Sequence, residues 1–169
     1  KDRSPTLRFS GRSYILPKTG QNGIPVTSIN ADAAEISIYR VGDRGLVRQV
    51  LDGMVGQSLG SWDAKTLGGQ TGQKVFDGQI KLRVQRNSEV TTAVPVREVI
   101  PDLETGVYAM LARPSGTKET SQAATQWFVV SDVGLTAISG NDGVHVLLRS
   151  LETAQPLSGV SVRLVAKNN

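Results

Sequence analysis

Residues 35–39 run Glu-Ile-Ser-Ile-Tyr, and this alternation of polar and apolar side chains decides the fold class. Successive side chains of a strand point to opposite faces of its sheet, so a period of two predicts a strand with one buried face. Similar runs recur at residues 7–9, 14–16, 26–29, 80–84, 94–99, 107–112 and 126–130. About seven short strands within 130 residues predict an all-β protein, a seven-stranded antiparallel β-sandwich.

One segment departs from the strand pattern. Its apolar residues recur at helical spacing, and they are Leu46, Val47, Val50, Leu51, Met54 and Val55. This spacing predicts one short helix, which begins near Asp43 and ends at Gly53 or Gly56. The run Gly-Gly-Gln-Thr-Gly-Gln at residues 68–73 then predicts a flexible loop.

The strand pattern restarts after Ser131. Residues 135–137 and 144–148 flank the turn Gly140-Asn141-Asp142-Gly143, and residues 160–164 alternate again. Two or three strands are too few for a sandwich, and a lone hairpin is marginal in water. We therefore expect a sandwich domain over residues 1–131, and the opening strands of a second, truncated domain over residues 132–169.

The composition excludes several classes of protein. The chain has 169 residues, no Cys and one His, which excludes a disulfide framework, a Cys nucleophile and a His-rich metal centre. The net charge is +4, but the cations are scattered and are not interleaved with aromatic residues, so we expect no nucleic-acid binding. No stretch approaches the roughly 20 apolar residues of a transmembrane helix, so we expect no membrane insertion by this chain. We find no signal peptide, and because the chain starts at Lys1 we expect a fragment or a processed product.

Three short motifs match the signature of serine-dependent penicillin-binding enzymes. They are Ser115-Gly116-Thr117-Lys118, Ser28-Ile29-Asn30 and Lys18-Thr19-Gly20. In those enzymes the nucleophilic Ser opens a helix, whereas Ser115 follows a predicted strand in a Pro-Gly loop, and the chain order of the motifs is reversed. We therefore expect no enzyme, and we assign no catalytic, cofactor-binding or metal-binding residue.

Other candidate groups favour structural roles. His145 lies in a predicted strand, and nothing in the sequence places Asp142 or Glu152 beside it. The remaining carboxylates occur singly, and residues 68–72 lack the pattern of a phosphate-binding loop. For both Trp62 and Trp127 we expect packing rather than ligand binding. Trp62 would either plug the core from a loop or face a neighbour, and Trp127 and Phe128 would lie on opposite faces of one strand.

The chain resembles an internal stretch of the bacterial alpha-2-macroglobulins. The resemblance begins with Leu-Arg-Phe-Ser-Gly-Arg-Ser-Tyr-Ile-Leu-Pro at residues 7–17 and continues through residues 30–41 and 43–54. Residues 127–135, Trp-Phe-Val-Val-Ser-Asp-Val-Gly-Leu, resemble the join between two macroglobulin-like domains. Residues 144–164 resemble the opening strands of the next domain, although Ala154 stands where the family often has Gly.

This resemblance implies a macroglobulin-like sandwich of the fibronectin-III and immunoglobulin-like type, and a non-catalytic scaffold piece of a broad-spectrum protease inhibitor. The parent protein would be periplasmic, anchored to the inner membrane by a lipid, and would work beside a penicillin-binding protein. In such a trap a protease cuts a bait segment, the molecule rearranges and a thioester acylates the attacker. None of these working residues can be assigned here, because the thioester needs a Cys-x-Glu-Gln run and the chain has no Cys. The expected partners are the neighbouring domains of the parent chain and its target proteases.

A second function remains open on the residues alone. Sandwich folds also serve as adhesion or protein-interaction modules of secreted and surface proteins, and fold does not choose between these roles. A carbohydrate-binding module is disfavoured because the chain contains only eight aromatic residues.

Overall fold

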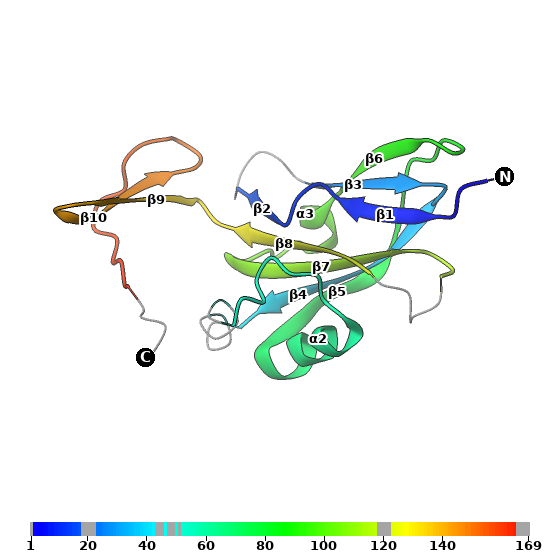
Figure 1. Ribbon diagram of the computed structural model, residues 1–169, viewed down its shortest axis with the longest axis horizontal. Coiled ribbons are helices and arrows are strands. Elements are labelled where there is room, and N and C mark those ends of the chain that lie inside the picture. The colour runs from blue at the N-terminus through cyan, green and yellow to red at the C-terminus, as the bar shows by residue number, and fades with distance from the viewer. Residues whose placement is uncertain are drawn as a thin grey trace.

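The computed structural model describes residues 2–17, 23–42, 46, 50, 52–117 and 123–164. Most of the chain forms two facing sheets, and a separate hairpin extends from one end (Figure 1). The strands are β1 (Thr6–Phe9), β2 (Ser13–Leu16), β3 (Ile24–Ile29), β4 (Ala33–Val41), β5 (Gly72–Lys81), β6 (Glu89–Val94), β7 (Gly106–Pro114), β8 (Ala124–Val130), β9 (Val133–Gly140) and β10 (Gly143–Ser150). The helical elements are α2 (Ser61–Thr66), the π-helical turn η1 (Leu67–Thr71) and α3 (Val96–Val99).

The first strand of the sandwich is divided between the two sheets. One sheet has the order β1-β3-β6 and the other the order β2-β8-β7-β4-β5. β1 pairs antiparallel with β3, whereas β2 pairs parallel with β8. Gly11, at φ +109°, lies in the crossing between β1 and β2. The predicted all-β sandwich is confirmed, and β2–β8 is its one parallel pair among the described strands.

The main core lies between the two sheets. Its largest fully buried side chains include Leu16, Ile24, Ile36, Ile38, Tyr108, Met110 and Phe128. The rings of Tyr108 and Phe128 stack with centroids 5.0 Å apart. The alternation in residues 35–39 therefore corresponds to the two faces of the sheet. Ile36 and Ile38 lie in this core, and Glu35 and Ser37 lie on the outer face.

A second core covers part of the outer face of the five-stranded sheet. It consists of Tyr39, Val41, Leu59, Leu67, Ala109 and Trp127. Residues from the segment between β4 and β5 supply its outer wall, and Leu67 is fully buried there. Trp127 and Phe128 therefore serve different cores, which confirms the prediction that they face opposite ways.

Residues 68–73 were predicted to form a flexible loop, and this prediction is wrong. Leu67–Thr71 forms a π-helical turn, and Gly72 begins β5. The glycines permit close packing rather than flexibility: a Cβ atom on Gly68 would lie 3.1 Å from the Tyr39 ring, and one on Gly72 would lie 2.2 Å from the Arg40 carbonyl oxygen.

Two other predicted strands differ in the structure. The strand expected over residues 94–99 ends at Val94, and Val96–Val99 forms α3 because Pro95 cannot continue a hydrogen-bonded ladder. Residues 160–164 alternate in sequence but form no strand, since no neighbouring strand pairs with them in the described chain. The strand predicted at 80–84 begins earlier, at Gly72, and ends at Lys81.

The helix predicted from Asp43 lies largely outside the described residues, which omit 43–45, 47–49 and 51. Leu46 and Val50 are described and are helical. Gly53 and Gly56, the predicted end of this helix, have φ values of +71° and +86°.

Candidate functional site

The two described Ser residues of the enzyme-like motifs, Ser28 and Ser115, are held by contacts with neighbouring strands. Ser115 follows β7, and its hydroxyl accepts a hydrogen bond of 2.6 Å from the Gln79 amide. Ser28 is buried in β3, where its hydroxyl donates to the Val90 carbonyl at 3.5 Å. Lys118 and the Lys18-Thr19-Gly20 motif lie outside the described residues.

His145 has a partner that the sequence did not reveal. The two-residue turn brings the Asp142 Oδ2 atom to 2.9 Å from the His145 Nε2 atom, and both side chains are well exposed, at 73% and 59%. Glu152 lies elsewhere, with its backbone N–H donating to Asp132 at 3.0 Å. Within the described ranges, no group of three His, Asp or Glu residues is arranged to hold a metal ion.

The two Trp residues have opposite environments. Trp127 is buried, and its indole N–H donates to the Gln57 carbonyl at 2.8 Å, so the packing role predicted for it is confirmed. Trp62 is 72% exposed, so the prediction that it plugs the core from a loop is wrong, whereas the alternative that it faces a neighbouring domain stays a prediction. The reason is its place in α2, a helix of six residues in which no side chain is buried.

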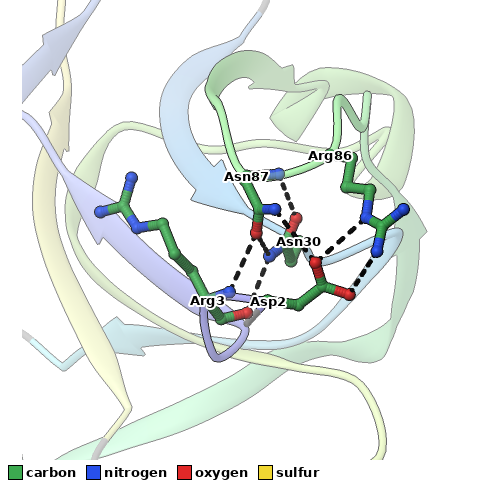
Figure 2. A network of polar contacts seen from close by, with 5 residues as sticks. All are labelled: Asp2, Arg3, Asn30, Arg86 and Asn87. Atoms are coloured by element: carbon green, nitrogen blue, oxygen red, sulfur yellow. Dashed lines mark hydrogen bonds and ion pairs between the residues drawn. The ribbon is translucent and has the colours of Figure 1, made fainter.

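A polar cluster at the start of the chain joins three segments that are far apart in sequence (Figure 2). We call it the N-terminal clasp, and it consists of Asp2, Arg3, Asn30, Arg86 and Asn87. The Asn87 Oδ1 atom accepts from the Arg3 backbone N–H and from the Asn30 amide, both at 2.9 Å. The Asn30 side chain also accepts from the Asn87 N–H at 2.6 Å and donates to the Arg3 carbonyl at 2.7 Å. The clasp thereby ties the N-terminal segment to the turns after β3 and β5.

Backbone shape and charge both favour this arrangement. Asn30 and Asn87 have φ values of +49° and +58°, in the left-handed region that Asn tolerates better than most residues. Arg86 binds Asp2 through two hydrogen bonds, of 2.9 and 3.1 Å. The hydrogen bonds from Arg86 and Asn87 lower the pKa of Asp2 below its usual value. The clasp was not predicted from the sequence. Asn is common in turns, so Asn30 and Asn87 do indicate the two turns in which they lie, but not the contacts between them.

A groove of about 990 Å³ lies on the outer face of the five-stranded sheet. Its walls come from β4, β5, β7 and residues 58–65. Four of its charged side chains form two pairs: Arg113 lies 2.6 Å from Glu35, and Asp77 accepts from Lys74 at 3.0 Å and also from Ser37 at 2.7 Å. These two bonds, with that from Ser37 the larger cause, lower the pKa of Asp77, and Asp77 in turn raises the pKa of Lys74. These four charged side chains of the groove therefore hold one another in place, and Lys65 is a fifth charged residue of its lining.

A tyrosine links the start of β7 to the preceding turn. The Tyr108 hydroxyl donates to the Glu104 carbonyl at 2.8 Å, four residues upstream. The Arg40 guanidinium reaches the same turn, 3.2 Å from the Glu104 carboxylate and from the Thr105 carbonyl. Burial raises the pKa of Tyr108, so its hydroxyl stays protonated and able to donate. This contact matches the tyrosine corner of β-sandwich domains.

The β9–β10 hairpin carries apolar side chains that have no cover in the described chain. The register places Leu135 opposite Leu148, Ala137 opposite Val146 and Ser139 opposite Val144, all on one face. We call this surface the apolar hairpin face. Leu135 and Val144 are 59% and 63% exposed, which is unusual for a sheet face of this composition.

Comparison with known proteins identifies the family of this chain. A family model described as the bacterial alpha-2 macroglobulin MG2 domain matches residues 8–128, which is more than half of the chain. A second model, described as the bacterial alpha-2-macroglobulin MG3 domain, matches residues 130–169. The chain belongs to the bacterial alpha-2-macroglobulins. The resemblance noted in residues 7–17, 30–41 and 127–135 is thereby confirmed.

Two curated relatives are alpha-2-macroglobulins from Escherichia coli strain K12 and Xylella fastidiosa strain Temecula1. The chain is 26% identical to the first over 165 residues and 25% identical to the second over 164 residues, and these matches cover 98% and 94% of the chain. Each match covers 10% of the relative, so the chain spans about a tenth of the length of these proteins.

Solved structures of the Escherichia coli protein share the fold. A crystal structure of native alpha-2-macroglobulin spanning domains NIE-MG1 matches with a TM-score of 0.75 and 24% identity, over 90% of this chain and 73% of that one. A cryo-EM reconstruction of the native conformation matches with a TM-score of 0.70 and 24% identity, over 93% of this chain and 10% of that one. These structures span several domains of one polypeptide. The neighbours that we expect for this bacterial alpha-2-macroglobulin segment are therefore other domains of its own chain.

Among the described residues, the longest helical elements are far too short to cross a bilayer.

Proposed function

We propose that this chain is a non-catalytic scaffold segment of a protease-trapping alpha-2-macroglobulin. The observation that carries the proposal is the succession of two macroglobulin-domain matches along one chain, over residues 8–128 and 130–169. The contacts of the candidate groups support a structural role, since Ser115, Ser28 and Asp77 are all held by neighbouring side chains or strands.

We further propose that the segment divides at Ser131 into a sandwich, residues 1–131, and the opening strands of the next domain, residues 132–169. The apolar hairpin face supports this division, because a sandwich strand buries one face against a second sheet. Asp132 secures the base of the hairpin: its carbonyl accepts from the Leu151 N–H at 2.7 Å, and its carboxylate from the Ser150 hydroxyl at 3.1 Å. The rest of the second domain would cover the apolar hairpin face in the parent protein.

The activity of the parent protein follows as part of the same proposal. The parent inhibits proteases of broad specificity: cleavage of a bait segment triggers rearrangement, and a thioester elsewhere in the protein acylates the protease. It resides in the periplasm, is held to the inner membrane by a lipid, acts beside a penicillin-binding protein and protects the cell envelope. The absence of Cys from this chain means that the thioester cannot lie within these residues.

Incubation with a protease tests the proposal. The full parent protein is mixed with trypsin, and the products are separated in denaturing gel and analysed by mass spectrometry. We expect a covalent adduct with the parent protein, no adduct after treatment with methylamine, which opens thioesters, and no adduct with the 169-residue chain alone. A covalent adduct formed by the 169-residue chain would contradict the scaffold role, and a parent protein that forms none would contradict the trapping role.

Fractionation of the native cells tests the location. We expect the parent protein in the inner-membrane fraction, accessible to a protease once the outer membrane has been permeabilised. Recovery in the cytoplasmic fraction would contradict this part of the proposal.

A further inference from the structure

The first and last strands of the sandwich are paired with each other, and they run in the same direction. β2 and β8 form a parallel ladder in which Ser13 lies opposite Trp127 and Leu16 opposite Val130. The chain enters the sandwich through β1 and β2 and leaves it through β8. Figure 1 shows the N-terminus at one end of the sandwich and the hairpin beyond β8 at the other.

This topology determines how the sandwich responds to tension along the chain. A pull on the N-terminal side draws β2 toward its own start, and a pull on the C-terminal side draws β8 toward its own end. Because the two strands are parallel, these forces are opposed along one axis and shear the ladder. All its hydrogen bonds are then loaded together, whereas strands peeled apart from one end lose their bonds one at a time.

Contacts at the end of the ladder hold β2 in register. Arg97 of α3 donates from its guanidinium to the Pro17 carbonyl, directly after β2. The Ser131 N–H donates to the Leu16 carbonyl at 3.4 Å, directly after β8. The Leu16 side chain is fully buried in the main core, so sliding of β2 would expose it to water.

The N-terminal clasp resists the same motion at the other end of the segment. It fastens residues 2 and 3 to Asn30, Arg86 and Asn87, upstream of β1. Residues 2–17 are therefore attached near both ends and paired with a different sheet in each half.

We propose that the β2–β8 pair is a mechanical clamp, which keeps this domain folded when tension passes along the polypeptide from one domain to the next. The proposal goes beyond the scaffold role and rests on the parallel pairing of β2 and β8 and on the contacts at the ends of these strands. Forced unfolding is governed by the rate of unfolding, so the direction of the load determines resistance even where the free energy of unfolding is unchanged.

Single-molecule pulling in two directions tests the clamp on the full 169-residue chain. Because the chain has no Cys, pairs of introduced Cys residues define unique attachment points for the handles. Arg12→Cys with Val133→Cys applies the load directly to β2 and β8 and shears the ladder, whereas Pro17→Cys with Ser131→Cys pulls apart two neighbouring strand ends. At one loading rate we expect the first pair to unfold at about twofold higher force or more, since unfolding under load follows the kinetic barrier. Equal forces, or a lower force for the first pair, would overturn the proposal and leave the family membership untouched.

A substitution at the end of the clamp refines the test. Arg97→Ala, measured in both pulling directions, removes the contact to Pro17. We expect it to lower the force in the shear direction more than in the peeling direction, while Arg8→Ala, which removes an exposed pair with Glu89, leaves the ratio of the two forces unchanged. An equal decrease in both directions for Arg97→Ala would show a general loss of stability and would overturn the role of Arg97 in the clamp.

Discussion

Tyr108 shows how one hydroxyl stabilises a corner of the sandwich. Its ring lies in the main core against Phe128, while its hydroxyl reaches back to the Glu104 carbonyl. We expect Tyr108→Phe to lower the free energy of unfolding by about 1 kcal/mol, because one part-buried hydrogen bond is lost and the apolar ring is retained. Urea denaturation measures this change, with Tyr14→Phe as the control within about 0.5 kcal/mol of the parent chain. If Tyr108→Phe and Tyr14→Phe lowered the free energy of unfolding equally, the stabilising role of the Tyr108–Glu104 hydrogen bond would be contradicted.

Asp77 makes stability depend on pH in the acid range. Its pKa is lowered in the folded chain, chiefly by the hydrogen bond from Ser37 and then by that from Lys74. A lowered pKa means that its contribution is present above the usual carboxyl pKa and is lost as the pH falls through the folded-state value. We expect Asp77→Asn to flatten the decline in the free energy of unfolding below about pH 4. Denaturation at a series of pH values gives the free energy of unfolding at each pH and tests this prediction. An equal decline in the free energy of unfolding for the variant and the parent chain would contradict it.

At the scale of single elements, the second core depends on β8 and on the segment between β4 and β5. Trp127 fills this core and bonds to Gln57 from that segment. We expect Trp127→Phe to lower the free energy of unfolding by about 2 kcal/mol through lost volume and one lost hydrogen bond, and the exposed Trp62→Phe to stay within about 0.5 kcal/mol. Each variant keeps a single Trp, so fluorescence-detected denaturation reports both. If Trp62→Phe lowered the free energy of unfolding more than Trp127→Phe does, the packing role that we assign to Trp127 would be contradicted.

The N-terminal clasp makes a separate prediction about the segment that precedes β1. Asn87→Gly keeps the left-handed backbone available but removes the acceptor of the Arg3 N–H. We expect faster hydrogen exchange of the Arg3 amide in this variant, while the exchange of β7 amides is unchanged. Exchange measured by NMR resolves both, and Arg3 protection that persists in Asn87→Gly would contradict the clasp.

The strands could be predicted from sequence wherever one face is buried and a partner strand lies alongside, as in β4 and β8. The pattern failed where local geometry interrupts it. Val75 is unpaired at a register shift between β4 and β5, so the period of two is broken in the first half of β5. For residues 160–164 the pattern predicted a strand that the structure does not contain. Alternation shows where the apolar side chains are, but it does not show whether a neighbouring strand is available for pairing.

The candidate sites were harder to predict than the strands. The clasp joins residues that are 27 to 85 positions apart in sequence, and the spacing of polar residues within one segment carries no signal of such contacts. The Asp142–His145 contact is local, but it depends on the conformation of the turn at Asn141 and Asp142. Only the family resemblance pointed to the identity of the chain, and it did so through strand segments rather than through a reactive site.

At the scale of the whole molecule, the chain combines a closed sandwich with an exposed hairpin. The sandwich has two cores and attachments at both ends of its first strand, whereas nearly every side chain of β9 is exposed. A two-stranded hairpin of this kind is marginally stable alone. Our central proposal is that these two parts belong to two successive domains, in line with the separate family-model matches over residues 8–128 and 130–169.

Native-state hydrogen exchange of the 169-residue chain, resolved by peptide mass spectrometry, tests this claim most directly. We expect two classes of protection that divide near Ser131: slow exchange of β4, β7 and β8 through global unfolding, and much faster exchange of β9 and β10 through local opening. Equal, cooperative protection of the sandwich and the hairpin would show one folding unit and would contradict the account.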